Sequence, residues 1–403
     1  MEQQILIGFD AKRITHNATG LGNYCRTLVN NIIRKNSGKY LLRLYTPDAG
    51  NPLLKNRMVL DKHVRFAYPR KNLWKSLWRS ALIVNDLTSD GIKLYHGLTG
   101  ELPIGIKKTG IKTVVTIHDL IFMRHPIYYH WTESLIYKIK FRLTCKEADH
   151  FIAISECTKS DIMSLGGIPD SRISVIYQGC DEGFKQQVDE KRKQQVSDSH
   201  HLPPKYILTV GTLEERKNAG LIVKALERLP YDINLVMVGR RTPYINKVMR
   251  EAERHGIGKR ILILSDLPFS DLPAIYQMAE VFVYPSRYEG FGIPIIEAIH
   301  SGIPVVAAKG SCLEEAGGPD SMYVDPDDAD ALARCILANL QHTPEREQRI
   351  VKSRQYVARF DEQNLADEVL KVYESLLSTV PASKHDKMRL KRQNGFSLKK
   401  LFP

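Results

Sequence analysis

A glycine-rich turn between two acidic residues is the part of the sequence best suited to chemistry. Glu289 and Glu297 stand eight positions apart, with Gly290, Gly292 and Pro294 between them. Proline favours the first turn of a helix, so Glu297 is expected near the positive end of a helix dipole. Its carboxylate could accept two hydrogen bonds from a vicinal diol such as a ribose, while Glu289 could contact a sugar or balance charge at a reacting carbon. Dipole stabilisation alone would account for Glu297 but not for the whole arrangement.

A basic pair, Arg216 and Lys217, follows a predicted strand in the stretch "ILTVGTLEERKN". Gly211 allows a tight turn after that strand, and a helix is expected to begin near Asn218. Two cations beside a helix N-terminus can hold a diphosphate, because side-chain charge adds to hydrogen bonds from backbone amides. An exposed basic pair without a ligand is the alternative. The pattern GxxxxGK[ST] does not occur, which argues against a P-loop that hydrolyses nucleoside triphosphates.

Two features of the first half also follow predicted strands. Gly20 and Gly22 precede a predicted helix, where the backbone could approach an anion closely, although an ordinary loop is the alternative. His118 follows the apolar run "KTVVTI", and the alternative here is a histidine that only caps the strand. His96 has a similar position with less support.

Short apolar runs alternate with helical patterns in both halves, and 403 residues suggest two domains or three. Continuous apolar strands separated by helices predict an α/β fold with mainly parallel sheets, in two Rossmann-like halves. Strands are expected at 4–10, 39–46, 92–97, 112–119, 150–155, 173–179, 205–212, 234–240, 260–266, 281–286 and 303–308. Helices are expected at 22–35, 132–147, 155–165, 218–229, 243–255, 270–279, 294–301 and 362–378.

The polar stretch 185–202, which two prolines follow, is predicted to be a surface linker. It divides the chain into an N-terminal domain with the linker at 1–198 and a second domain at 199–358, followed by a helix within 359–380 and a tail at 381–403. Two doubly wound domains create a cleft, and open parallel sheets bind ligands beyond the carboxyl ends of their strands. Residues directly after strands are therefore expected to form the site.

The formal net charge of +13 indicates an anionic partner. The tail 381–403 contributes seven basic residues and one acidic residue, interleaved with apolar side chains. This mixture suits an anionic membrane surface, and a solubilising tail is the alternative. No nucleic-acid-binding module is recognisable and the other cations are dispersed, so nucleic acid is not an expected partner.

Compartment and metal content can also be predicted. Six scattered cysteines lack metal-ligand spacing, which favours reduced thiols. The start lacks the features of a signal peptide, and no apolar run approaches the roughly 18–20 residues of a membrane span. A cytoplasmic protein is expected, with the tail as a means of attachment to the inner face of the cytoplasmic membrane. The acidic segment 325–330 lacks the pattern of a calcium-binding loop and is predicted to be a surface loop.

Together these residues resemble the retaining, two-domain glycosyltransferases of family 4, which have the GT-B fold. The segment from Glu289 to Glu297 matches the paired-glutamate EX7E motif of that family. The basic pair, the glycine pair and the histidine introduced above match further motifs in the same order. The resemblance extends over nearly the whole chain, and it implies that the helix within 359–380 crosses back to an acceptor-binding N-terminal domain.

The resemblance implies a role for each residue of the turn. Glu297 would hold the ribose hydroxyls of a nucleotide sugar, and Glu289 would lie near the transferred sugar. The backbone amides of Phe291 and Gly292 would bind the hydroxyls of that sugar. The segment around Leu267 would contact the base.

The reaction implied is transfer of a sugar with retention of anomeric configuration, through an oxocarbenium-like transition state. Arg216 and Lys217 would neutralise the leaving diphosphate, beside the glycine pair and Gly211. Since that diphosphate can accept the acceptor's proton, His118 would orient the sugar or stabilise charge rather than act as a general base. No metal or other cofactor is expected.

The stretches "ITHNATGLGNY" and "TIHDL" are most similar to bacterial transferases that assemble surface polysaccharide. They imply GDP-mannose as the first candidate donor, a UDP-hexose as the next, and a glycan or lipid-linked glycan as acceptor. A UDP-sugar 2-epimerase of the same two-lobed architecture and a non-catalytic nucleotide-sugar-binding protein are the alternatives. A dehydrogenase is disfavoured because neither half carries GxGxxG.

Overall fold

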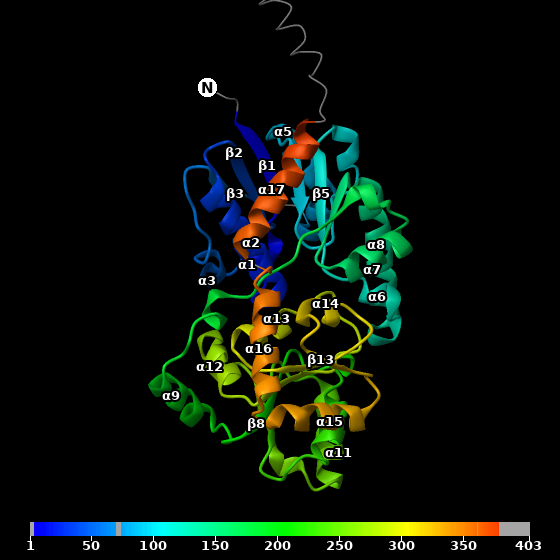
Figure 1. Cartoon of the computed structure of the whole chain (residues 1–403). Helices are drawn as coiled ribbons and strands as arrows, with labels where there is room; N and C mark the ends of the chain where they lie inside the picture. Colours follow the sequence, from blue (N-terminus) through cyan, green and yellow to red (C-terminus); the bar gives the residue numbers. More distant parts are fainter. Residues whose placement is uncertain (1–3, 70–73, 361, 379–403) are drawn as a thin grey trace, which may run out of the picture.

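Two β-sheets organise the chain. The computed structural model describes residues 4–69, 74–360 and 362–378. They form an N-terminal unit around a seven-stranded sheet and a C-terminal unit around a six-stranded sheet (Figure 1). All strand pairs of the two sheets are parallel. The predicted fold class is therefore confirmed.

The N-terminal sheet has the strand order β3-β2-β1-β4-β5-β6-β7. Its strands are β1 (Ile5–Asp10), β2 (Tyr40–Tyr45), β3 (Val64–Ala67), β4 (Leu94–Gly97), β5 (Lys112–Ile117), β6 (His150–Ala153) and β7 (Ile173–Val175). The order reverses between β1 and β4, and such a switch point opens a crevice at the carboxyl ends of the strands. The predicted strands did not include β3, in which Arg65 interrupts the short apolar run.

The C-terminal sheet has the order β10-β9-β8-β11-β12-β13, with its switch point between β8 and β11. Its strands are β8 (Tyr206–Val210), β9 (Asn234–Val238), β10 (Ile261–Leu264), β11 (Val281–Tyr284), β12 (Val305–Ala308) and β13 (Met322–Val324). The segments after β8 and β11 carry the predicted basic pair and the glutamate turn. Parallel neighbours end at the same sheet edge, so these segments are brought together.

Helices connect the strands of both sheets. In the N-terminal unit they are α1 (Lys12–His16), α2 (Gly20–Lys35), α3 (Pro52–Lys55), α4 (Lys75–Leu77), η1 (Trp78–Leu82), α5 (Ile83–Ser89), η2 (Ile106–Thr109), α6 (Ile121–Arg124), η3 (Pro126–Tyr128), α7 (Trp131–Glu147), α8 (Glu156–Gly166) and η4 (Asp170–Arg172). After β7 come η5 (Glu182–Phe184), α9 (Glu190–His200), η6 (Glu215–Lys217), α10 (Ala219–Leu226), α11 (Pro243–Arg254), η7 (Gly258–Arg260), η8 (Phe269–Asp271), α12 (Leu272–Gln277), α13 (Ile293–His300), α14 (Leu313–Gly317), α15 (Ala329–Leu340), α16 (Pro344–Val357) and α17 (Glu362–Ser378). None of these helices is long and apolar enough to cross a membrane.

The stretch 185–202, predicted to be a surface linker, instead contains helix α9. Its one buried side chain, Val196, packs in the core of the C-terminal unit. Asp271 accepts hydrogen bonds from Arg192 at 2.5 Å and from His200 at 2.9 Å, which fixes the helix beside α12. Composition alone could not predict this helix, because its partners lie some 70–80 residues further along the chain.

The last helix, α17, returns to the N-terminal unit and lies beside α2 (Figure 1). Its apolar side chains Leu365, Val369 and Tyr373 are buried in the core of that unit. The hydroxyl of Tyr373 is 2.6 Å from Nδ1 of His96, which burial keeps neutral by lowering its pKa to about 3. His96 is therefore a core residue that fastens α17 to the sheet. The predicted tail, 381–403, lies outside the described residues.

Candidate active site

Glu289 lies between the two cations that were predicted to bind a diphosphate. Its Oε2 is 2.8 Å from Nη1 of Arg216, and its Oε1 is 2.5 Å from Nζ of Lys217. All three side chains are at most 16% exposed. Residues 72 and 73 positions apart thus form one buried ion cluster.

Mutual attraction keeps this cluster ionised. Burial by itself would raise the pKa of Glu289, but the charges of Lys217 and Arg216 outweigh it and lower that pKa. Burial would likewise lower the pKa of Lys217, but the Glu289 carboxylate raises it. Glu214 contacts Arg216 from the other side at 2.7 Å. The carboxylates hold in place two cations that could neutralise a ligand's phosphates.

Two further residues lie around the cluster. Tyr284 was not predicted from the sequence, and Gly211 was predicted only to allow a tight turn. Tyr284, at the end of β11, contacts Lys217 Nζ at 2.5 Å and donates to Glu289 at 3.3 Å. Gly211 has φ +145°, and a Cβ atom there would lie 3.4 Å from Lys217 Cε. The tight turn expected at Gly211 therefore leaves room for the lysine stem.

Glu297 occupies a different environment. It lies in α13, is 9% exposed, and accepts a 2.8 Å hydrogen bond from the Tyr276 hydroxyl. Burial raises the pKa of Glu297 from 4.5 to about 7, although the Tyr276 hydrogen bond opposes the rise. One glutamate of the pair is thus held ionised, and the other titrates near neutral pH.

This difference predicts a pH-dependent stability that depends on Glu297. Because its pKa is higher in the folded than in the unfolded chain, its contribution is fully present below about pH 4.5 and is lost as the pH rises to about 7. The loss should be about 3 kcal/mol in the free energy of unfolding. Denaturant unfolding should show no such fall in the free energy of unfolding of Glu297→Gln between about pH 4.5 and about pH 7. The variant Glu280→Gln, an exchange of the same kind away from the cleft, should retain the fall. If the free energy of unfolding of Glu297→Gln fell with pH as it does in the wild type, Glu297 would not be the group responsible.

A cavity of about 410 Å³ lies between the two units beside Glu297. Gly20 and Tyr24 of α2 line it on one side, and Phe269, Ile293 and Glu297 line it on the other. It is large enough to hold part of a drug-sized ligand. The predicted cleft thus exists between the two sheets, with one predicted residue from each unit on its walls.

The two predicted glycines of α2 differ in what they do. A Cβ atom at Gly22 would lie 1.9 Å from the carbonyl oxygen of Asn17, so the preceding loop requires a glycine there. A Cβ atom at Gly20 would meet no atom within 4 Å. The fold itself therefore explains the glycine at position 22, whereas Gly20 leaves the backbone open towards the cavity.

Leu267, predicted to mark the base-contacting segment, packs partly buried against the core of the C-terminal unit. The cavity beside Glu297 is lined two residues later by Phe269, which is 48% exposed. An aromatic face is suited to stacking on a base. The segment is near the site, but the sequence did not show which of its side chains faces the cavity.

His118 lies at the end of β5 and is held by two neighbours. Its Nε2 is 3.0 Å from the carbonyl oxygen of Leu98, and its Nδ1 is 3.3 Å from the amide nitrogen of Gln178. Burial lowers the pKa of His118 to about 4, so the ring is neutral at neutral pH. A neutral ring with both nitrogens occupied is poorly placed to take a proton, and it is better suited to positioning.

The glutamate turn contacts the N-terminal unit directly. The carbonyl oxygen of Gly290 accepts hydrogen bonds from Ser155 Oγ at 2.6 Å and from Thr158 Oγ1 at 3.1 Å. A Cβ atom at Gly290 would lie 1.9 Å from the carbonyl oxygen of His118. Gly290 is therefore a point at which the two units touch, one residue from the ion cluster.

The next two residues complete the turn. Phe291 is buried and packs against the rings of Tyr177 and Phe360. Gly292 precedes the first turn of α13, and a Cβ atom there would lie 2.8 Å from Cβ of Ala316. Phe291 thus anchors the turn with its side chain, and Gly292 allows the helix to pack closely on α14.

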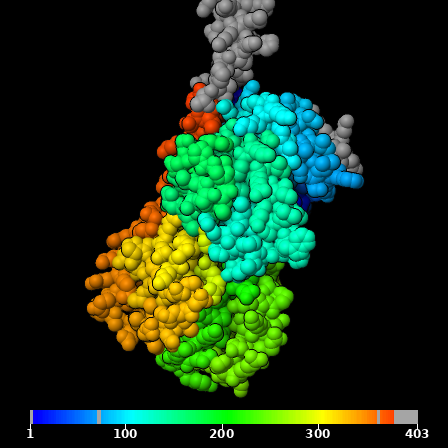
Figure 2. All heavy atoms as spheres, turned by 90° about the vertical axis from the view of Figure 1, so that its right-hand side faces the viewer, coloured from blue at the N-terminus to red at the C-terminus, as the bar shows by residue number. Residues whose placement is uncertain are grey.

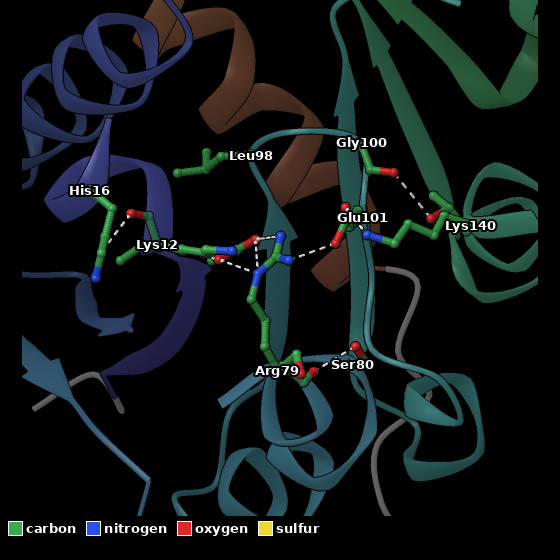
Figure 3. Close-up of polar contacts among 12 residues, drawn as sticks. Lys12, His16, Arg79, Ser80, Leu98, Gly100, Glu101 and Lys140 are labelled. Carbon is green, nitrogen blue, oxygen red and sulfur yellow. Dashed lines mark hydrogen bonds and ion pairs between the residues drawn. The ribbon is translucent and has the colours of Figure 1, made fainter. Parts of the chain in front are cut away.

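A second charged network lies in the N-terminal unit (Figure 3), and sequence patterns did not predict it. Arg79 bonds Asp10 at 2.7 Å and Glu101 at 2.6 Å, and Lys140 of α7 reaches the other oxygen of Glu101 at 3.0 Å. Burial would raise the pKa of Asp10, but Arg79 lowers it, so the pair stays ionised. Glu101 and Lys140 also line a cavity of about 220 Å³ with His118. The charged network therefore extends, through Glu101 and Lys140, to the cavity that His118 lines.

The acidic segment 325–330 has structural roles. Asp328 caps α15 by accepting from the amide of Ala331 at 2.8 Å, and Asp327 pairs with Arg287. Among the described residues, no group of three or more His, Cys, Asp or Glu side chains could hold a metal ion.

Both units match known sequence families. Residues 18–184 match the family described as Glycosyltransferase Family 4, and residues 190–356 match the family described as Glycosyl transferases group 1. The chain belongs to glycosyltransferase family 4. The matches cover the C-terminal sheet and all strands of the N-terminal sheet except β1, and they contain the glycine pair, the histidine, the basic pair and both glutamates.

The relatives of this family 4 glycosyltransferase agree with that assignment. O-antigen chain mannosyltransferase B of Escherichia coli is 27% identical over 327 residues, which are 80% of this chain and 82% of the relative. O-antigen chain mannosyltransferase RfbU of Salmonella typhimurium is 29% identical over 62% of this chain and 66% of its own length. The crystal structure of Anabaena HepE superposes with a TM-score of 0.71 at 18% identity, over 93% of this chain and all of HepE. The GT-B fold is confirmed, and the protein is a glycosyltransferase rather than an epimerase or a dehydrogenase.

Proposed function

We propose that this family 4 glycosyltransferase moves mannose from GDP-mannose to a glycan or lipid-linked glycan during surface polysaccharide synthesis, with retention of anomeric configuration. The observation that carries the proposal is the buried cluster of Glu289 with Arg216 and Lys217, in a turn that leads within eight residues to Glu297 on the wall of the cavity between the units. The relatives that are named O-antigen mannosyltransferases support the choice of sugar.

On the donor side, we assign the diphosphate to Arg216 and Lys217 and the ribose to Glu297. A carboxylate accepts hydrogen bonds from two adjacent hydroxyls only when it is ionised. Because the pKa of Glu297 is about 7, donor binding should release a proton below that pH. Phe269, on the same cavity wall, is the side chain we assign to the base.

Chemistry in this arrangement is electrostatic. As the bond from the sugar to the diphosphate breaks, negative charge grows on the leaving oxygen, and preorganised cations stabilise that charge in a buried site. Glu289 holds those cations in place and lies one residue from the contact with the N-terminal unit. The acceptor's proton passes to the leaving diphosphate, which leaves His118 a positioning role.

On the acceptor side, we propose that the N-terminal unit binds the glycan in the cavity of about 220 Å³ beside His118. Tyr129 and Tyr137 provide aromatic surface there, and Glu101 and Lys140 provide polar groups. Sugars present both apolar faces and hydroxyls, so this lining suits one. The proposed division is acceptor binding within 1–198 and donor binding within 199–358.

Melting of the purified protein with GDP, UDP and ADP, and then with their sugars, tests the donor. A ligand at 100 times its Kd should add about 2.7 kcal/mol to the free energy of unfolding. GDP and GDP-mannose should raise the melting temperature most. A preference for UDP and a UDP-hexose would replace the proposed donor, and no shift with any nucleotide would reject the donor site.

The tail 381–403, with its interleaved basic and apolar residues, is proposed to attach the enzyme to an anionic membrane surface. Salt-sensitive binding to anionic vesicles should weaken when the tail is deleted. Equal binding without the tail would reject this role.

A further inference from the structure

The side chain of Tyr288 leaves the C-terminal unit and enters the N-terminal unit. Its buried hydroxyl donates a hydrogen bond to Oδ2 of Asp161 in α8 at 2.6 Å and lies 3.3 Å from Sγ of Cys157. Its ring centroid is 4.8 Å from that of His125, which follows α6. Figure 2 shows this side of the molecule, where teal and green atoms of the N-terminal unit meet yellow atoms of the C-terminal unit. One side chain, directly before Glu289 in the sequence, thus joins the two units.

The backbone of Tyr288 holds one of the two cations of the ion cluster. Its carbonyl oxygen accepts a hydrogen bond from Nη1 of Arg216 at 2.5 Å. The next residue, Glu289, pairs with the same guanidinium at 2.8 Å. Arg216 is therefore fixed to a dipeptide whose first side chain is anchored in the other unit. A shift of the N-terminal unit would reach the guanidinium through one residue and two hydrogen bonds.

The anchor in the N-terminal unit is a buried carboxylate with both oxygens occupied. Asp161 is 2% exposed, and its Oδ1 accepts from Nε of Arg124 at 3.0 Å, while its Oδ2 accepts from Tyr288. Burial raises the pKa of Tyr288, and the hydrogen bond to Asp161 adds to the rise, so the phenol keeps the proton that it donates. Hydrogen bonds to a charged partner are shorter and stronger than those between neutral groups.

The segment 118–129 connects this anchor to the cavity that we assign to the acceptor. It contains His118 and further side chains that line the cavity, such as Tyr129. The same segment supplies Arg124 to the anchor carboxylate. The segment that carries the histidine therefore also sets the position of Tyr288.

We propose that Tyr288 is a positioning residue for sugar transfer. Its hydroxyl, held by Asp161, sets the distance between the unit that carries His118 and the cation Arg216 that neutralises the leaving diphosphate. This inference rests on the donor-side role proposed for Arg216. In this role Tyr288 touches no reacting atom and exchanges no proton. A phenylalanine would fill the same space, so the bond made by the hydroxyl is what separates positioning from simple packing.

Tyr288→Phe removes the hydroxyl and keeps the ring. It should lower kcat by about 10–100-fold, because a displacement of about 1 Å near the reacting groups can cost about 100-fold. The donor KM and the rise in melting temperature caused by a nucleoside diphosphate should not change, since Arg216 and Lys217 keep their pairing with Glu289. Turnover is measured as release of nucleoside diphosphate from radiolabelled donor, with water as the acceptor, so that slow hydrolysis suffices.

Asp161→Asn tests whether Tyr288 acts through its partner. The hydroxyl of Tyr288 and the carboxylate of Asp161 make one contact, and residues that share a contact have non-additive effects. The double variant should therefore lower kcat no further than the more damaging of the two single variants. Multiplied effects in the double variant would overturn the proposal.

A second measurement needs neither donor nor turnover. Cys157 is half-buried beside the Tyr288 hydroxyl, so its alkylation by iodoacetamide reports how often the two units separate at this contact. Tyr288→Phe should raise the alkylation rate of Cys157 several-fold. Cys335 of α15, which is also half-buried, provides the internal reference. Burial raises the thiol pKa of both cysteines, so the comparison is between like groups.

Tyr206→Phe is the matched control. The buried hydroxyl of Tyr206 donates to the carbonyl oxygen of Ile275 at 2.6 Å, within the C-terminal unit. The variant loses a hydroxyl bond of the same length, but the bond does not cross between the units. It should lower the melting temperature and leave both kcat and the alkylation of Cys157 as in the wild type.

Three results would overturn the positioning role of Tyr288. They are wild-type kcat in Tyr288→Phe, unchanged alkylation of Cys157 in that variant, and loss of the nucleotide-induced rise in melting temperature, which would place Tyr288 in the donor site itself. A wild type whose melting temperature no nucleotide raises would instead reject the proposed function. The alkylation rates would decide in that case too whether the Tyr288 hydroxyl holds the units together.

Discussion

Glu289→Ala will lower turnover by a factor on the order of 10²–10³ while the protein still binds a nucleoside diphosphate. The buried cations Arg216 and Lys217 will lose the carboxylate that holds them, at 2.8 and 2.5 Å, in the geometry needed for the leaving group. Turnover is measured as release of nucleoside diphosphate from the donor that the melting experiment selects.

The same variant has a second, separable effect on stability. Removing one partner of a buried ion cluster leaves uncompensated charge, which costs about 3–5 kcal/mol of the free energy of unfolding. A nucleoside diphosphate brings compensating charge, so its stabilising effect on Glu289→Ala should be larger than on the wild type. Glu289→Ala should therefore have a lower free energy of unfolding than the wild type without ligand, and a nucleoside diphosphate should raise its melting temperature by more.

Glu297→Ala is the matched control, because it removes the other glutamate of the motif. The group that loses its partner in this variant is the neutral hydroxyl of Tyr276, which donates to Glu297 at 2.8 Å, rather than a cation. Above about pH 7 its removal should cost little stability, since a buried charge disappears with it. The rise in melting temperature that a nucleotide causes should be smaller in Glu297→Ala than in the wild type. Undiminished turnover in folded Glu289→Ala, or identical behaviour of the two variants, would contradict the roles proposed for the pair.

Gly290→Ala will lower turnover by about 100-fold although it adds only one methyl group. That methyl would lie 1.9 Å from the carbonyl oxygen of His118 and 3.0 Å from Cβ of Asp119, so the two units could not approach as they do here. A displacement of about 1 Å between reacting groups is enough for a loss of this size. The donor residues of the C-terminal unit are untouched, so the nucleotide-induced melting shift should persist.

Thr158→Val provides the control for this contact. It removes the 3.1 Å hydrogen bond from Thr158 Oγ1 to the Gly290 carbonyl but adds no atom that overlaps the other unit. Loss of one such bond costs about 1 kcal/mol, so turnover should stay within about tenfold of the wild type. Wild-type turnover in Gly290→Ala would show that this contact is absent from the catalytic state.

The sequence by itself determined the family and the local motifs, because these depend on residues that are close in the chain. A proline after two glycines predicts a turn and the start of a helix wherever the segment lies, and α13 begins at Ile293 as expected. Apolar stripes likewise predicted α2 and α17, since a helical period needs only about two turns to be visible. Spacing also indicated that Glu289 and Glu297 act as a pair.

Only the tertiary structure decided what surrounds each of those residues. The sheet order places β8 beside β11, and this brings Arg216 and Lys217 to Glu289 and keeps that glutamate ionised. Packing of α12 on α13 buries Glu297 against Tyr276 and raises the pKa of Glu297 to about 7. The sequence alone cannot show this difference between Glu297 and Glu289. Helix α9 formed for the same reason, because Asp271 holds it from a distant part of the chain. Charge, burial and pKa depend on neighbours in space, and in a parallel α/β fold those neighbours come from strands far apart in the sequence.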